Sequence, residues 1–287
     1  LELDRILNEA GIYAGSQGDS HTAISLLRRS VEIRATTRSE EPLEKSIAYS
    51  NLALQLQKTA DFLSEAEKYH RLALEIDEKY LPANHPDLAI TLSNIGTYYN
   101  AVGDFEKSVS FAERALEIDK NNMGPTSFEF GIRAMNLGST YSEWGAISNN
   151  IDLMTKGHKL LLDAESAIAT SRGVRHPNMP DCLYFLARSY AVLSRELESA
   201  DVLIKAIAIK SSLNLHDHPF VDQCSKAMGR YLYISIGKEK ADTLIRNKLE
   251  NLEIEILEVE EQHRKWVKID PDNRSFGVKS LKTGASS

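Results

Sequence analysis

The sequence predicts an all-α protein, built as a solenoid of about six helix-turn-helix repeats and continued by a longer C-terminal helix. Three observations predict this fold. A helix-turn-helix segment runs from His85 to Ile118, it recurs every 41 to 49 residues, and each copy has apolar residues at helical spacing. Because one helical hairpin cannot bury its apolar faces alone, each copy needs neighbours of the same kind.

The segment from His85 to Ile118 is the clearest copy. His85-Pro86-Asp87 begins its first helix, since proline lacks an N–H group that would find no partner in a first turn. Gly103-Asp104 ends that helix. The apolar residues of the first helix, at steps of four, three and four, are Leu88, Leu92, Ile95 and Tyr99. Those of the second helix are Phe105, Val109, Ala112 and Leu116.

An anchor residue, five positions before a tyrosine or leucine, marks each copy. The anchors follow one another at steps of 43, 43, 42, 49 and 41 and are Asn8, Asn51, Asn94, Asn136, Phe185 and Lys226. The repeats predicted from this spacing cover about residues 1–36, 43–80, 85–122, 127–171, 176–212 and 218–254. Beyond this 1–254 solenoid we expect a C-terminal helix extension at 255–268 and a disordered tail at 269–287.

These repeats resemble the tetratricopeptide repeat (TPR), in the variety of about 42 residues that occurs in kinesin light chains. The residues that carry the resemblance are His85-Pro86-Asp87, His176-Pro177, His218-Pro219, Asn94-Ile95-Gly96 and Asn136-Leu137-Gly138. The resemblance covers nearly all of residues 1–254 and implies a right-handed α-solenoid that acts as a protein-interaction scaffold. Such repeats occur in motor cargo adaptors, ciliary scaffolds and sensor arms of signalling ATPases, so the resemblance names no partner.

Composition and motifs exclude several other classes of function. The net charge of −7, without a clustered basic surface in the repeats, argues against a nucleic-acid partner. No apolar run is long enough to span a membrane. A Gly-rich phosphate loop, His-Glu-x-x-His and Gly-x-Ser-x-Gly are all missing, so we expect no enzyme and no cofactor. We expect a cytoplasmic protein, and, since the chain does not start with Met, a piece of a longer one.

Two sets of residues could form a disulfide or a metal site, and neither is predicted to do so. Cys182 and Cys224 lie in the first helices of adjacent repeats, where reduced thiols are favoured over a disulfide. His216-Asp217-His218 contains zinc-ligand types, but no further ligand lies at a suitable spacing. His218 is also explained by the repeat's His-Pro opening. We therefore predict no metal site.

Two repeats depart from the pattern. In the first, Glu9 stands where the other copies carry a leucine or isoleucine, which indicates an exposed end of the stack: a cap, or a repeat without its upstream neighbour. In the fourth, the first helix is expected to end at Trp144-Gly145, with residues 146–150 as an added loop. Since loops of repeat arrays often bind partners, Trp144 is either an exposed contact or a cover for the adjacent core.

The resemblance implies that the first helix of each repeat lines a concave groove. Each groove stripe contains the residues four before, at, three after and seven after an anchor, all on one helix face. The residues that we predict to bind a peptide there are Ile47, Asn51, Leu54, Lys58, Ile90, Asn94, Thr97, Ile132, Asn136, Ser139 and Arg188. The same stripes also hold Glu143, Phe185 and Val192.

The chemistry of this groove suits an extended peptide. An asparagine amide can hold the N–H and C=O groups of a peptide backbone, while isoleucines form an apolar shelf for its side chains. The alternative is that the asparagines satisfy contacts between helices and that the isoleucines are partly stacked away. A clamp for a C-terminal carboxylate is not expected, because the basic residues are scattered over different repeats: Lys58, Arg188 and Lys226.

An acidic helix near the C-terminus has an apolar heptad seam, formed by Ile245, Leu249, Leu252, Ile256 and Val259. It either covers the end of the last repeat of a monomer or joins two chains in a short coiled coil.

Two functions remain open. One is an adaptor that binds a linear peptide or partner protein in the groove. The other is a sensor arm of a larger signalling protein, such as a STAND-type ATPase, that holds another domain in cis.

Overall fold

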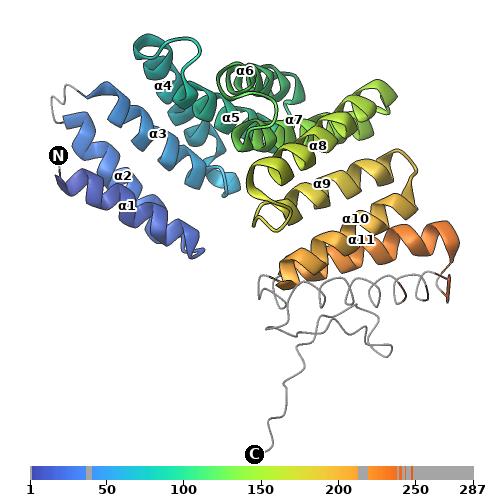
Figure 1. Cartoon of the computed structure of the whole chain (residues 1–287). Helices are drawn as coiled ribbons and strands as arrows, with labels where there is room; N and C mark the ends of the chain where they lie inside the picture. Colours follow the sequence, from blue (N-terminus) through green and yellow to red (C-terminus); the bar gives the residue numbers. More distant parts are fainter. Residues whose placement is uncertain are drawn as a thin grey trace, which may run out of the picture. The chain divides into compact units, whose positions relative to one another are not determined.

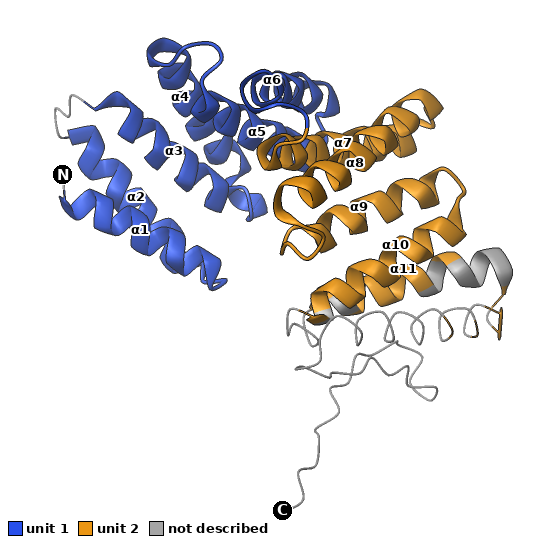
Figure 2. Ribbon diagram, viewed as in Figure 1, with its two compact units in different colours: residues 1–125 blue, residues 126–287 orange. Residues whose placement is uncertain are grey.

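The structure is a computed structural model that describes residues 2–36, 41–212 and 219–237, with single residues at 239, 240, 243 and 247. The chain divides into two compact units, residues 1–125 and 126–287 (Figures 1 and 2). Among the described residues we find eleven α-helices, one short 3-10 helix and no strand. The predicted all-α solenoid fold is confirmed.

Unit 1 consists of three helical hairpins. Their helices are α1 (Glu2–Ser16), α2 (Ser20–Thr36), α3 (Pro42–Leu56), α4 (Leu63–Tyr80), α5 (Pro86–Ala101) and α6 (Phe105–Met123), with a 3-10 turn η1 (Ala60–Phe62) before α4. The second helix of each hairpin packs on the first helix of the next, α2 on α3 and α4 on α5. The first helices α1, α3 and α5 also contact one another in order, and the face that they share is called the first-helix face below.

Unit 2 repeats this arrangement. Its helices are α7 (Phe128–Ser148), α8 (Ile151–Arg172), α9 (Met179–Val192), α10 (Glu196–Ser212) and α11 (Pro219–Ile236). Helix α8 packs on α9 and α10 on α11, while α7 and α9 share the first-helix face. The predicted coiled-coil seam, the helix at 255–268, the tail at 269–287 and His216-Asp217-His218 lie outside the described residues.

Matching turns set the register between the first and third hairpins. Gly18 and Gly103, 85 positions apart, have φ angles of 83° and 81°, in the left-handed region that glycine adopts without strain. Each is followed by an aspartate whose side chain caps the next helix: Asp19 Oδ1 accepts from the N–H of Thr22 at 3.0 Å, and Asp104 Oδ1 from that of Lys107 at 3.2 Å.

This register corrects the anchor predicted in the first repeat. The residue equivalent to Asn94 is Glu9, one position after Asn8, because the two turns align helix α1 with α5 at the same offset of 85. Glu9 is exposed and pairs with Arg5 at 3.8 Å. The prediction that Glu9 occupies the leucine or isoleucine position of the other copies is therefore wrong.

The fourth repeat also differs from its prediction. Residues 146–148 continue α7, and the chain turns at Asn149, which has a left-handed φ of 50°. Asn150 then caps α8 by accepting hydrogen bonds from the N–H groups of Asp152 and Leu153, at 3.0 and 3.2 Å. The predicted loop after Gly145 is wrong, because the extra residues lengthen the two helices. Trp144 lies half-buried within α7.

Glycines hold the long α7–α8 hairpin together. They recur every seven residues on α7, at Gly131, Gly138 and Gly145, where each lies close to α8, and Gly138 meets Gly157 of that helix. A Cβ atom on Gly157 would lie 2.6 Å from the carbonyl oxygen of Gly138 and 2.5 Å from Oγ of Ser142. The two backbones therefore approach more closely than any side chain would permit.

Buried polar groups in unit 1 are paired across helices. Arg34 Nε of α2 lies 2.7 Å from Asp4 Oδ2 of α1, and both side chains are buried. Arg34 also reaches Glu44 of α3 at 3.2 Å, so one guanidinium joins three helices.

His70 is buried on α4, with Nε2 3.0 Å from Oε1 of Gln57. Burial lowers the pKa of His70 from 6.5 to about 4.

We expect Gly157→Ala to lower the free energy of unfolding by about 2 kcal/mol, because overpacking against backbone atoms outweighs the gain in helix propensity. Urea unfolding followed by circular dichroism measures the change. Thr155→Ala, on the exposed side of α8, is the control and should change the free energy of unfolding by less than about 0.5 kcal/mol. Equal stability of the two variants would contradict the close approach.

Acid should destabilise unit 1 through His70. The unfolded chain binds a proton near pH 6.5 and the folded chain near pH 4, so stability falls as the pH drops through this window. Between pH 7.5 and 5.0 the loss from this group is about 2 kcal/mol. His70→Gln should remove that part of the pH dependence, measured by urea unfolding at both pH values. The exposed His21→Gln variant should retain it, and the prediction fails if both variants behave alike.

Candidate functional site

The first-helix face of unit 1 keeps the predicted isoleucines accessible. Ile47 of α3 and Ile90 of α5 are 50 % and 48 % exposed, although each belongs to a helix whose other faces are buried. The remaining predicted residues of this unit are half-buried or exposed, namely Asn51, Leu54, Lys58, Asn94 and Thr97. Apolar side chains that remain exposed on an ordered face can contact a partner.

The asparagines of the predicted groove differ in their contacts. Asn51 Nδ2 donates to Asn8 Oδ1 at 3.1 Å, so this amide joins α3 to α1, as the alternative interpretation proposed. Asn94 and Asn136 are half-buried, and their side chains form no hydrogen bond with the residues that the structure describes. Their amides therefore keep donors and an acceptor for a peptide backbone.

Two other polar residues of this face bond to residues three or four positions before them. Lys58 Nζ donates to Gln55 Oε1 at 3.0 Å, and Thr97 Oγ1 donates to the carbonyl of Ser93 at 3.0 Å. Gln55 lies against Gly15 of α1, where a Cβ atom would meet its amide at 2.5 Å. Lys58 is thus held beside a packed contact between α1 and α3.

In unit 2 the first-helix face contains a cavity of about 170 Å³ between α7 and α9. Two of the predicted residues, Ser139 and Arg188, line it together. Its other lining residues are Ser142, Glu143, Ala146, Ile147, Phe185 and Val192. Ile132 and Asn136, half-buried nearer the start of α7, are not among its lining residues.

Sequence reasoning placed Glu143, Phe185 and Val192 on the groove stripes but missed three residues of this cavity. Ala146 and Ile147 were missed because α7 was expected to end at Trp144-Gly145, and Ser142 because it lies one residue off the predicted stripe. The signal that could have found Ala146 and Ile147 is their spacing of three and four residues from Glu143, which continues the helical stripe.

The cavity combines opposite charges with an aromatic wall. Arg188 and Glu143 are half-buried, and neither forms an ion pair with any residue in the described part of the chain. Phe185 and Val192 add apolar surface from α9, and Ile147, 68 % exposed, adds more from α7. A guanidinium that is not already paired can bind a carboxylate or a backbone carbonyl, so this cavity can hold a polar group beside an apolar one.

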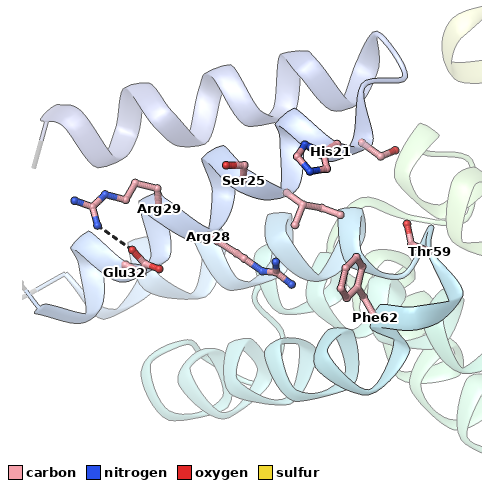
Figure 3. Close-up of a pocket in the computed structure, with 9 residues that line it drawn as sticks. His21, Ser25, Arg28, Arg29, Glu32, Thr59 and Phe62 are labelled. Carbon is pink, nitrogen blue, oxygen red and sulfur yellow. Dashed lines mark hydrogen bonds and ion pairs between the residues drawn. The ribbon is translucent and has the colours of Figure 1, made fainter.

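Two further cavities lie away from the first-helix face. The one in unit 1, about 740 Å³, is lined by α2 and the turn before α4 (Figure 3). The guanidinium of Arg28 donates two hydrogen bonds to the carboxylate of Glu65, at 3.2 and 2.6 Å. It also lies 5.0 Å from the ring centre of Phe62, and Figure 3 shows Arg28 and Phe62 side by side. The one in unit 2, about 380 Å³, is lined by α8, α9 and α10 with their connections. Neither contains a predicted groove residue.

The cysteines are free, and both are buried, in agreement with the predicted reduced thiols. Burial raises the pKa of Cys182 and of Cys224 to about 12 each, so both remain protonated at neutral pH. Within the described ranges, no three His, Cys, Asp or Glu side chains are grouped as a metal site requires. In the same ranges, no helix has the length and hydropathy of a membrane span.

Part of the chain matches a known repeat family. Residues 44–121 match the family model of the tetratricopeptide repeat. Among curated proteins, Protein fem-1 homolog C of Danio rerio is 28 % identical over 121 residues, which cover 40 % of this chain and 20 % of that protein. The aligned part thus spans about a fifth of that relative.

Solved structures extend the likeness over most of the chain. BtubC (BKLC) from P. vanneervenii superimposes with a TM-score of 0.63 at 19 % identity, covering 88 % of this chain and 98 % of that one. The nearly identical TPR-like repeats of a putative kinesin light chain from Podosopora anserina give a TM-score of 0.59 at 20 % identity, covering 73 % and 95 %. At such identities the structural likeness supports the fold.

Proposed function

Because residues 44–121 are tetratricopeptide repeats within a solenoid of the kinesin-light-chain type, we propose that this chain is a non-enzymatic scaffold that binds an extended peptide of a partner protein. The peptide occupies the first-helix face, in each unit separately. TPR proteins are interaction modules, and their binding specificity depends on the side chains that the scaffold presents.

The observation that carries this proposal is the cavity between α7 and α9. It brings together Ser139 and Arg188, which are 49 positions apart and hold the same place on the predicted stripes of the fourth and fifth repeats; Phe185 also lines it. A guanidinium without an ion pair, next to an aromatic ring, can bind a carboxylate or carbonyl of a peptide while the ring packs on an apolar side chain.

The asparagines support the same proposal. Asn94 in unit 1 and Asn136 in unit 2 have amides that no described residue engages, and Ile90 lies exposed one turn before Asn94. Such an amide binds a peptide backbone whatever its sequence, whereas the isoleucine selects apolar side chains. Asn51 contributes less, because one of its donors is used by Asn8.

A selection from a displayed library of random 15-residue peptides tests the proposal. Peptides selected on the wild-type chain should bind the Arg188→Ala variant, or the Asn94→Ala/Asn136→Ala double variant, at least tenfold more weakly, as expected for one lost charge-assisted bond or two amide contacts. Isothermal calorimetry gives the dissociation constants, and circular dichroism confirms that the variants are equally helical.

The matched control is Lys159→Ala, which removes a cation from the exposed side of α8 and should leave the affinity unchanged. Peptides that bind all variants equally would place the binding surface elsewhere. A failure to select any peptide would count against the proposed function.

A further inference from the structure

Helix α1 has an apolar face that no described residue covers. Leu3, Ile6 and Tyr13 are 59 %, 52 % and 67 % exposed, and the exposed Ala10 lies between the last two. The steps of three, four and three place all four on one face of the helix. Three large apolar side chains exposed together on a regular helix form an interaction surface rather than a random scatter.

The same face of α5 is an interface. With the offset of 85 set by the Gly18 and Gly103 turns, the residues equivalent to this face of α1 are Leu88, Thr91, Ile95 and Tyr98. All four are at most 5 % exposed. The difference between the two helices is therefore the presence of a covering neighbour, since their position within the repeat is identical.

The neighbour that covers this face of α5 is α4, the second helix of the preceding hairpin. Tyr98 donates its hydroxyl hydrogen to the carbonyl of Leu63 at 3.0 Å, and its ring lies 5.5 Å from that of His70. Thr91 Oγ1 donates to Asp77 Oδ2 at 2.6 Å. An amphipathic helix that runs along the whole stripe thus fills this position.

The corrected register strengthens the comparison. Glu9 aligns with Asn94 on the first-helix face, so α1 has no charged residue at the four positions that face α4 in the third hairpin. Terminal repeats of a solenoid that end in water usually present a polar outer face. Helix α1 instead presents Leu3, Ile6 and Tyr13.

We infer that this face of α1 binds the second helix of a further helical hairpin, placed on α1 as α4 is placed on α5. The chemistry of the occupant follows from the one position where the two faces differ in polarity. Ile6 replaces Thr91 and offers no hydroxyl, so the bound helix carries an apolar residue where α4 carries Asp77. The bound helix also presents a backbone carbonyl to the hydroxyl of Tyr13, as α4 presents that of Leu63 to Tyr98.

A fused hairpin tests the inference on the full chain. A second copy of residues 42–85, with Asp77→Leu in that copy alone, is joined directly before Leu1, so that Leu1 takes the place of Pro86 and the native linker length is kept. We expect amide hydrogen exchange of α1 to slow at least tenfold relative to the unfused chain, because an uncovered terminal helix opens more readily than a stacked one.

Two substitutions, each made in the fused and in the unfused chain, identify the surface. Ile6→Asp should abolish the slowing of exchange, since it buries an unpaired carboxylate under the added hairpin. Ile12→Asp is the control: Ile12 is equivalent to Thr97 on the first-helix face and should leave the slowing intact. Measurement in the unfused chain shows whether either variant disturbs folding by itself.

Two results would overturn the inference. One is unchanged exchange of α1 in the fused chain, or slowing that survives Ile6→Asp. The other is concentration-dependent dimerisation of the unfused chain in sedimentation experiments, abolished by Ile6→Asp, which would assign the face to a second copy. A monomeric unfused chain with slowing sensitive only to Ile6 supports the added hairpin.

Discussion

Close approach of the two helices in each hairpin is the constraint on which the rest of the structure depends. A Cβ atom on Gly96 would lie 3.2 Å from the carbonyl oxygen of Ser108, whose hydroxyl donates to the Gly96 carbonyl at 2.8 Å. Ser199 bonds the carbonyl of Ala187 at the same distance in unit 2. Since this contact fixes how a first helix is rotated, it decides which face stacks on the preceding hairpin and which face remains accessible.

Stacking and the proposed peptide binding therefore use separate sides of one helix. On α5, Thr91 and Tyr98 bond to α4 and are buried, whereas Ile90, one residue from Thr91, remains half exposed. An exposed isoleucine does not add to the stability of the isolated fold, because it buries little apolar surface. Ile90 lies one turn before Asn94, whose amide no described side chain engages. This arrangement fits a surface whose apolar area is buried only when a partner binds.

The α7–α8 hairpin shows how an insertion alters such a surface without disturbing the repeat. Glycines let the longer helices remain in contact over their full length, so the extra residues extend α7 instead of forming a loop. The extension carries Ile147 to the cavity that Arg188 and Phe185 line from α9. A change in helix length thus becomes a change in the chemistry of the first-helix face, while the turn and the cap at Asn149 and Asn150 keep the hairpin closed.

The sequence by itself determined the all-α fold, the period of the repeats and most of the stripe that includes Ser139 and Arg188, because helical periodicity and Gly-Asp turns are local properties of the chain. It did not determine the register of the first repeat, the continuation of α7 past Trp144 or the bond from Asn51 to Asn8. These depend on how separate helices pack. The turn at Gly18 sets the register of the first repeat against a chance Asn-Tyr pair, and the glycines let α7 and α8 stay in close contact over their added length. The amide of Asn51 is bonded because Asn8, 43 positions away, packs beside it. Only the tertiary structure decides contacts of that kind, since their energy belongs to two elements at once.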